Sequence, residues 1–575
     1  MSPACLQLRK QFDRHPQYEY LAAAAFLALL SLIAHGDALT GSWRWDDGVH
    51  LNFAAHFSPW QYFFDPDIAR RYSSANVAPW NLLFYDINLS LFAMDARGHY
   101  AHLLFIVVLG ATLFYAVLRQ WLPVLPAMIG AIALVLGKPT FHIAAGLMHG
   151  HYATGFALAM LAVLGWIHYL RAGRWYWLAL SSFAYLLATT CKEIYVPLVV
   201  LLPFLPIGTL RQRARALLPF VLVAAAYTGW RYLVLGSLVG GYSQGEGFDF
   251  AKATYQLARI PLLLVGLKLP GMVLAISFIS LIVLAFARRR LNWPLLAVIF
   301  VVVLLPLLPL TAFPGINKAD RYLFIPWVAL SSCLAAILPQ HARFIPTAAL
   351  TALLIFALIA THWQEKRDTK HDILFWDTIY RFAISADKTQ QALFVGPDDG
   401  YKRLVLTAAR KAADLLEPDK TLEKLQVVDD SGNGRLLYIK TKDMQIFEFN
   451  DGKISPLSKE KLTEKFPQYP HLQFSQGLPL EIGLTSKEGV LKWKFGPYDG
   501  NYLVNIFSVP RLPDTEFILP REGGIHWNER GFFQISFCYS NIRENINACS
   551  PILKFDFSAT EKAVWHGISQ GPDAQ

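Results

Sequence analysis

Long apolar stretches recur along the first two thirds of the chain and then stop. Stretches long enough to cross roughly 30 Å of hydrocarbon begin at Tyr20 and end near His362. They predict about eleven membrane-spanning helices, centred near residues 28, 108, 130, 161, 183, 202, 226, 277, 303, 330 and 353. We therefore expect a multi-span α-helical membrane domain over residues 1–362 and a soluble domain over residues 363–575.

Basic residues collect in every second loop between the predicted spans. Lys and Arg favour the cytoplasmic side of a membrane, so these loops indicate the orientation of the chain. In chain order they contain Arg9, Lys10, Arg14, Arg119, Arg171, Arg174, Arg211, Arg213, Arg215, Arg288, Arg289, Arg290 and Arg343. The pattern predicts a cytoplasmic N-terminus and a C-terminal domain on the periplasmic or lumenal side.

The apolar pattern changes period within the soluble domain. From Ile373 to Leu416 apolar residues recur three and four positions apart, so residues 370–424 are predicted to be helical. After Lys424, short aromatic or β-branched runs alternate with Gly, Pro and Asp, which is typical of antiparallel strands. These runs include Leu436–Ile439, Met444–Phe449, Val490–Phe495 and Phe532–Phe537. We therefore predict an α+β domain rich in antiparallel strands, with a β-sandwich-like part over residues 425–570.

The two cysteines of the predicted sandwich differ from those of the membrane part. Cys538 and Cys549 lie on the side assigned as oxidising, and a polar stretch that favours a turn separates them. We therefore predict a disulfide that closes a hairpin. Cys191 and Cys333 are interpreted as small core residues.

Composition supports the membrane class and limits the partners. The chain is 54% hydrophobic and only 16% charged, which excludes an ordinary soluble enzyme. Its net charge of +10 requires no nucleic-acid partner, because anionic lipid of the inner leaflet is sufficient to attract the basic loops.

The first predicted outer loop, residues 37–98, carries an acidic pair, Asp46 and Asp47. A carboxylate beside a bilayer is unfavourable in free energy unless it is hydrated, forms an ion pair or takes part in function. The pair of Asp46 and Asp47 is therefore a candidate catalytic site. An alternative is that it caps a helix that begins near Val49. Residues Ala78–Met94 of the same loop have apolar positions at helical spacing, which favours a helix in the membrane interface.

Cations in the other outer loops suit the binding of an anionic lipid carrier. The candidates are Lys138, Lys192, Lys318 and Arg321. Arg grips phosphate in a bidentate fork and Lys acts as a point charge, while a nearby carboxylate can serve as general base toward an acceptor hydroxyl. Lys192 could instead form a surface ion pair with Glu193, and Arg321 could extend to the lipid headgroups.

Several further polar side chains are candidates for lining a substrate cavity. They are Trp45, His50, His142, His149, His151, Glu193 and Tyr322. His149 and His151 are two positions apart and diverge on a helix, so no metal site is expected. Trp43 and Trp45 are first of all membrane-interface residues, with stacking on a sugar ring as the alternative.

Three segments, in order along the chain, resemble motifs of the GT-C glycosyltransferases. They are Trp45-Asp46-Asp47 after the first span, Cys191-Lys192-Glu193 after the fifth, and Asp320-Arg321-Tyr322-Leu323-Phe324-Ile325-Pro326. They are most similar to the protein O-mannosyltransferase branch that contains the transmembrane and tetratricopeptide-repeat proteins. Pro139-Thr140-Phe141-His142 is loosely similar to a Pro-x-His segment of that branch. The resemblance covers the membrane part only, because the C-terminal part has no such repeats.

The resemblance implies an inverting transfer of a sugar from a polyprenyl-phosphate carrier, with Asp46 or Asp47 as the acid-base residue and no bound nucleotide or other cofactor. The acceptor would be a protein, through O-glycosylation, or a glycan of the cell envelope. A bacterial inner membrane is favoured because the sandwich has no N-x-S/T sequon, although Asn88-Leu89-Ser90 is one. A non-catalytic scaffold that presents the β domain and a secondary transporter, whose polar residues would lie at the midplane, stay open.

Overall fold

Two compact units make up the chain. The computed structural model describes residues 16–73, 76–236, 249–266, 268–287, 298–299, 302–308, 320–338, 345–385, 392–396, 401–416, 425–429, 445–450, 452–458, 460–461, 464, 475–487, 490–507, 515–526, 532–541, 546–557 and 561–570. The first unit consists of Met1–Gly41 and Ala75–Lys370, and the second of Ser42–Ser74 and His371–Gln575. Residues 42–74, which the sequence pattern grouped with the membrane domain, therefore belong to the same unit as the C-terminal strands.

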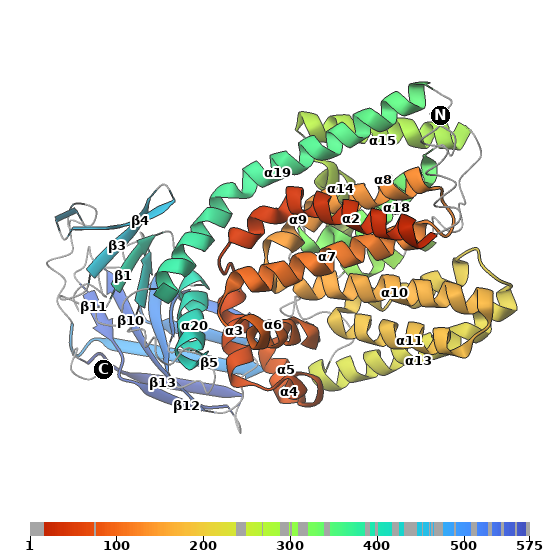
Figure 1. Cartoon of the computed structure of the whole chain (residues 1–575). Helices are drawn as coiled ribbons and strands as arrows, with labels where there is room; N and C mark the ends of the chain where they lie inside the picture. The colour runs from red at the N-terminus through yellow and green to blue at the C-terminus, as the bar shows by residue number, and fades with distance from the viewer. Residues whose placement is uncertain are drawn as a thin grey trace. The chain divides into compact units, whose positions relative to one another are not determined.

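Helices form the first unit (Figure 1). The longer ones are α2 (Pro16–His35), α6 (Pro79–Phe92), α7 (Ala96–Leu118), α8 (Val124–Leu136), α9 (Lys138–Ala145), α10 (Gly150–Ala172), α11 (Trp175–Cys191), α13 (Leu210–Leu235), α14 (Phe250–Val265), α15 (Leu269–Ala287), α18 (Phe324–Ile337) and α19 (Ile345–Ser385), which continues into the second unit. Short turns include η3 (Glu193–Tyr195) and η6 (Arg321–Leu323).

Five helices are long and apolar enough to cross a membrane. They are Gln17–Thr40, Ala96–Leu118, Leu147–Ala172, Leu210–Leu235 and Ala348–Ile384. Two bent pairs, α8 with α9 at 53° and α14 with α15 at 105°, raise the number to 7 if each is one span. The described residues thus establish a multi-pass helical unit. The helix predicted over Ala78–Met94 is confirmed as α6.

Aromatic side chains hold α10, α11 and α13 side by side (Figure 1). Trp166 of α10 meets Phe220 of α13 with ring centroids 5.2 Å apart, and Phe220 meets Tyr185 of α11 at 5.3 Å. Edge contacts of this kind add stability beyond the apolar area that they bury. This packing fixes the end of α11, where Lys192 follows.

The bend between α8 and α9 depends on a close approach at Gly137. A Cβ at Gly137 would lie 1.9 Å from Nε1 of Trp327, so no larger residue fits without a shift of the indole. Pro139 then begins a new helix, because a proline in the first turn loses no helical hydrogen bond. Lys138 is thereby held at a fixed position at the start of α9.

The second unit combines short helices with three sheets (Figure 1). Its helices are α3 (Asp47–His56), α4 (Pro59–Phe64), α5 (Pro66–Tyr72), the end of α19 and α20 (Tyr401–Leu416). The strands are β1 (Ala392–Gly396), β2 (Leu425–Asp429), β3 (Gln445–Asn450), β4 (Lys453–Pro456), β5 (Pro479–Lys487), β6 (Val490–Gly496), β7 (Asn501–Phe507), β8 (Thr515–Pro520), β9 (Glu522–His526), β10 (Phe532–Asn541), β11 (Ile546–Cys549), β12 (Leu553–Asp556) and β13 (Lys562–Ile568).

Two antiparallel sheets form a sandwich. One has the order β13-β5-β6-β9, and the other has β11-β10-β7-β8 with β12 paired to β10. Buried residues from both, such as Ile482 and Phe537, share one core. Alternate positions of β5 and β6 are buried, as expected when one face of a sheet covers a core. Cys538 and Cys549 lie opposite each other on β10 and β11 and form a disulfide.

A third sheet corrects part of the predicted pattern. Its order is β2-β1-β3-β4, and both neighbours of β1 run parallel to it. Strand β1 lies inside residues 370–424, so the prediction of an all-helical stretch there is wrong. The apolar run Leu393–Val395 is too short for its period to separate helix from strand. The predicted run Leu436–Ile439 lies outside the described residues.

Candidate functional site

The first loop of the second unit places its two aspartates in different environments. Helix α3 begins at Asp47, and Asp46 occupies the N-cap without a capping hydrogen bond from its side chain. Asp47 is 0% exposed, and its Oδ2 accepts a hydrogen bond of 2.6 Å from the backbone N–H of Arg44. Asp46 is partly exposed. Asp47 therefore holds the loop from inside, while Asp46 is the more exposed of the two carboxylates.

The end of α19 supplies most of the contacts that hold this loop. Arg44 donates from Nε and Nη2 to the two carboxylate oxygens of Asp377, at 2.6 and 3.0 Å. The hydroxyl of Tyr380 donates to the carbonyl of Trp45 at 2.7 Å and accepts from the N–H of Gly48 at 3.0 Å. Trp45 has a φ of 45°, a left-handed conformation that is rare for a bulky residue. These bonds keep the backbone next to Asp46 in that conformation.

Close packing also fixes the start of α3. A Cβ at Gly48 would lie 1.9 Å from the backbone oxygen of Val405 on α20, so α3 and α20 meet backbone to backbone. His50 is buried one turn later, and its Nδ1 lies 3.0 Å from the hydroxyl of Tyr72. The indole of Trp45 donates to Asp372 at 3.1 Å, a contact that orients this ring within the unit.

A cationic cluster, Lys192, Arg231 and Arg321, occupies the first unit. Lys192 is 5% exposed and Arg231 is 6% exposed, and Arg321 is partly exposed. Burial lowers the pKa of the Lys192 ammonium; Glu193, whose carboxylate lies 3.8 Å away, raises it, and the guanidinium groups of Arg321 and Arg231 lower it further. One carboxylate and two guanidinium groups therefore act on Lys192. Cations of this kind suit the binding of a phosphate.

Arg321 enters this cluster from the turn η6. Asp320 caps the turn by accepting from the N–H of Tyr322 at 3.0 Å. The guanidinium carbon of Arg321 lies 4.6 Å from the ring centroid of Tyr322, and Nη2 donates to the Tyr322 hydroxyl at 3.3 Å. Stacking on an aromatic face pre-organises the guanidinium fork for a bidentate ligand.

Arg231 is the cation that sequence reasoning missed. It lies in α13, whose apolar length is that of a membrane span, so it is absent from the outer loops that were searched for candidates. A signal was available, because an arginine inside an apolar helix is a candidate functional residue by default.

Lys138 and His142 meet at a carboxylate that the sequence did not suggest. Glu365 of α19 lies 3.2 Å from Nζ of Lys138 through one oxygen and 3.1 Å from Nε2 of His142 through the other. His149 Nδ1 lies 2.8 Å from the carbonyl of His142, and the ring of His151 packs on Tyr152 at 4.6 Å. Lys138 therefore has its own counter-ion. Lys318 lies outside the described residues.

Among the described residues, no group of three or more His, Cys, Asp or Glu side chains could hold a metal ion. The structure brings Lys192, Glu193 and Arg321 together with Arg231 in the first unit. It places Trp45, Asp46, Asp47 and His50 in the second. Asn88, the asparagine of the sequon, is fully buried, and its side-chain oxygen lies 2.6 Å from Nδ1 of His102.

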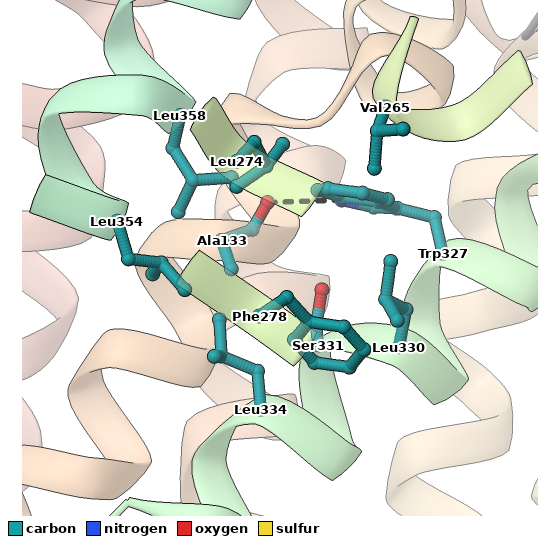
Figure 2. A pocket seen from close by; sticks show the side chains of 10 residues that line it. All are labelled: Ala133, Val265, Leu274, Phe278, Trp327, Leu330, Ser331, Leu334, Leu354 and Leu358. Atoms are coloured by element: carbon teal, nitrogen blue, oxygen red, sulfur yellow. Dashed lines mark hydrogen bonds between the residues drawn. The ribbon is translucent and has the colours of Figure 1, made fainter. Parts of the chain in front are cut away.

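A small apolar pocket of about 20 Å³ lies between α8, α14, α15, α18 and α19 (Figure 2). Its walls are mainly leucine, valine and aromatic side chains. Trp327 donates its indole N–H to the carbonyl of Ala133 at 2.9 Å, so its polar atom is used within the wall. Ser331 contributes a buried hydroxyl that has no hydrogen-bond partner within the described part of the chain. A pocket of this size has room for about one water molecule, so it is a packing gap between helices and not a substrate site.

No protein-family model matches this chain, and no curated protein matches its sequence. ArnT from Cupriavidus metallidurans bound to undecaprenyl phosphate is a similar solved structure, with 12% identity, a TM-score of 0.42 and coverage of 80% of this chain and 95% of that one. ArnT from the same organism in the apo state has 13% identity and a TM-score of 0.41, with coverage of 80% of this chain and 95% of that one. An Archaeoglobus fulgidus oligosaccharyltransferase tethered with an acceptor peptide has 12% identity and a TM-score of 0.41, with coverage of 88% of this chain and 76% of that one. At these values the likeness assigns no role to any residue of this chain.

Proposed function

We propose that this protein is an integral membrane glycosyltransferase that moves a sugar from a polyprenyl-phosphate carrier to an acceptor. The observation that carries the proposal is the cluster of Lys192, Arg231 and Arg321, in which Lys192 and Arg231 are buried and Glu193 is the carboxylate that acts on Lys192. Buried cations inside a membrane protein are costly, so a cluster of this kind is expected where an anionic ligand binds. The order of the three GT-C-like motifs supports the same reading.

The chemistry of the donor follows from the cationic cluster and from the GT-C-like motifs. A cationic cluster suits a phosphate, and the resemblance of the motifs implies a polyprenyl-phosphate carrier. Such a carrier has a phosphate and a hydrocarbon chain, whereas a nucleotide sugar has no hydrocarbon chain. We therefore assign the donor to the lipid-phosphate class, and assign its phosphate to Lys192, Arg231 and Arg321.

In the proposed reaction Asp46 acts as general base. Its carboxylate takes the proton of an acceptor hydroxyl as that oxygen forms a bond to the anomeric carbon of the sugar. The bond from this carbon to the phosphate oxygen breaks, and the electron pair leaves with the polyprenyl phosphate. A single displacement inverts the anomeric centre. The cations hold the phosphate of the donor before and after this bond breaks.

The topology belongs to the same proposal. We assign about eleven spans, a cytoplasmic N-terminus and a periplasmic C-terminal domain in a bacterial inner membrane, on the basis of the basic loops. The sequon Asn88-Leu89-Ser90 does not argue against this assignment, because the Asn88 side chain is buried in the folded protein. The acceptor class is a protein or a cell-envelope glycan.

Proteoliposomes with a panel of undecaprenyl-phosphate-linked hexoses and pentoses would test the proposal, with cell-envelope extract as the source of acceptor. Release of undecaprenyl phosphate is the readout. We expect release from at least one donor by the wild type and a loss of about a hundredfold to ten-thousandfold for Asp46→Asn. Asp67→Asn removes an exposed carboxylate of the same loop and should keep full activity. Folded wild-type protein that cleaves no donor in the panel would overturn the proposal and favour a scaffold.

A further inference from the structure

The loop Ser42–Gly48 depends on residues more than three hundred positions away in the sequence. Asp377 accepts from the N–H of Ser42 at 3.1 Å as well as from Arg44, so one carboxylate fixes two points of the loop. Tyr380, one helical turn further on, bonds to Trp45 and Gly48, which lie on either side of the aspartate pair. Both partners therefore hold the backbone that carries Asp46.

The cost of this arrangement indicates that it is more than a packing device. Trp45 stands in a left-handed backbone conformation, which is unfavourable for a residue with a bulky side chain. Arg44 is almost fully buried, and a buried ion pair usually contributes little net stability because both charges lose water. Strain and buried charge of this kind persist where geometry matters for function.

We propose that Tyr380 and Asp377 are positioning residues, which hold the loop Ser42–Gly48 so that the Asp46 carboxylate is presented at a fixed place and direction. This inference rests on the proposed function, because it takes Asp46 as the general base. Tyr380 acts through the backbone of Trp45 and Gly48, and Asp377 acts through Arg44. Neither residue touches the substrate. Catalysis by a general base falls steeply when the base is displaced by about 1 Å.

The first experiment measures the loop without any substrate. Hydrogen exchange of the Gly48 amide, resolved by fragmentation of the peptide that contains it, reports the bond to the Tyr380 hydroxyl. Tyr380→Phe removes the acceptor, so we expect exchange about fivefold faster at Gly48 with unchanged exchange in the strands of the sandwich. Thr378→Val, on the same turn of α19, is the control, because the Thr378 hydroxyl bonds to Leu374 of its own helix. Unchanged exchange at Gly48 in Tyr380→Phe would overturn the proposal.

The second experiment separates positioning from donor binding. In proteoliposomes with an active undecaprenyl-phosphate sugar, Tyr380→Phe and Asp377→Asn should lower kcat about tenfold to a hundredfold and leave the KM for the donor unchanged. Asp377→Glu keeps a carboxylate for Arg44 and should recover part of kcat. Thr378→Val should match the wild type. A raised KM with an unchanged kcat would overturn the proposal, as would equal activity of Asp377→Asn and wild type.

The two failures are distinguishable. If the wild type cleaves no donor, the proposed function fails, and the exchange rate of Gly48 still decides whether Tyr380 holds the loop. If the wild type is active and Tyr380→Phe loosens Gly48 without any change in kcat, the loop is held for stability alone and the positioning role is wrong. Melting temperatures of all variants identify any that fail to fold, and Asp377→Glu then replaces Asp377→Asn as the informative variant.

Discussion

The carboxylate of Glu365 lies 3.2 Å from the ammonium group of Lys138, and both side chains are mostly buried. Lys138 was expected to bind the donor phosphate, but this ion pair gives it a counter-ion within the protein. An ammonium group with a carboxylate at 3.2 Å attracts a phosphate less strongly than one whose carboxylate lies 3.8 Å away and whose neighbours include two guanidinium groups. The pair therefore ties α9 to α19 and contributes less to donor binding than the cluster around Lys192.

The ion pair predicts a specific pattern of stability. Lys138→Met and Glu365→Gln each leave a charged or polar partner without its counter-ion, so each should lower the free energy of unfolding by about 1–3 kcal/mol. The double variant should lose less than the sum of the two losses. A double-mutant cycle of melting temperatures in detergent measures this coupling. Losses that simply add would show that the pair contributes no coupling energy.

Substitutions of the two aspartates of the first loop should have different effects on stability and on turnover. Asp47→Asn weakens a buried acceptor for the Arg44 N–H, so it should lower the melting temperature while the folded fraction keeps measurable turnover. Asp46→Asn should remove turnover in a preparation that remains folded at the assay temperature. Thermal unfolding and undecaprenyl phosphate release, measured on the same preparations, test both. An inactive Asp47→Asn of normal stability beside an active Asp46→Asn would reverse the assignment of the base.

Local sequence was sufficient for elements whose pattern is strong. The runs Val490–Phe495 and Phe532–Phe537 fall within β6 and β10, and the helical spacing of Ala78–Met94 matches α6. Each of these segments is long enough, and regular enough, to fix its own period. The prediction was wrong at strand β1 because the apolar run of this strand is three residues long. So short a run can belong to either a helix or a strand.

The candidate site was only partly predictable, because the decisive contacts are long-range. Arg44 and Asp377 are 333 positions apart, and the local sequence around either residue does not indicate that the two form an ion pair. Arg231 lies in a helix with the apolar composition of a span, and Glu365 falls just after the last predicted span, in the part assigned to the soluble domain. Neither residue lies in the outer loops that supplied the candidates. Sequence identified the residue types that the chemistry needs, and the fold decided which of them meet and which are already paired.

Lys192 gives a prediction about pH. Its pKa is lowered in the folded protein, mainly by burial, so the folded state binds this proton less tightly than the unfolded state. Stability therefore decreases as pH falls from the ordinary lysine value, about 10.5, through the lowered value, and the penalty is complete below it. Lys192→Met removes the penalty. We expect a higher melting temperature than the wild type at neutral pH, with a difference that shrinks as pH approaches the ordinary value.

The same variant links stability to donor binding. Undecaprenyl phosphate should raise the melting temperature of the wild type, because a ligand that binds only the folded state stabilises it. The increase should be smaller in Lys192→Met. Lys268→Met removes an exposed lysine that pairs with Asp368, and it should respond as the wild type does. Equal increases in all three proteins would exclude Lys192 from the phosphate site.

Replacement of either arginine of the cationic cluster by lysine should weaken donor binding. Arg231→Lys and Arg321→Lys keep the charge but lose the planar fork that holds two phosphate oxygens at once. Loss of one charge-assisted hydrogen bond should raise the KM for the lipid-linked donor about tenfold. Turnover at saturating donor should stay near the wild-type value, because Asp46 is untouched.

A donor titration in proteoliposomes measures this separation. Arg97→Lys is the matched control, since Arg97 is an exposed arginine that pairs with Asp95 outside the cluster, and its KM should not change. Both cluster variants should recover at high donor concentration, whereas Asp46→Asn should not respond at any concentration. If Arg231→Lys instead loses turnover that no amount of donor restores, Arg231 acts in the chemical step or in folding, and its assignment to donor binding is wrong.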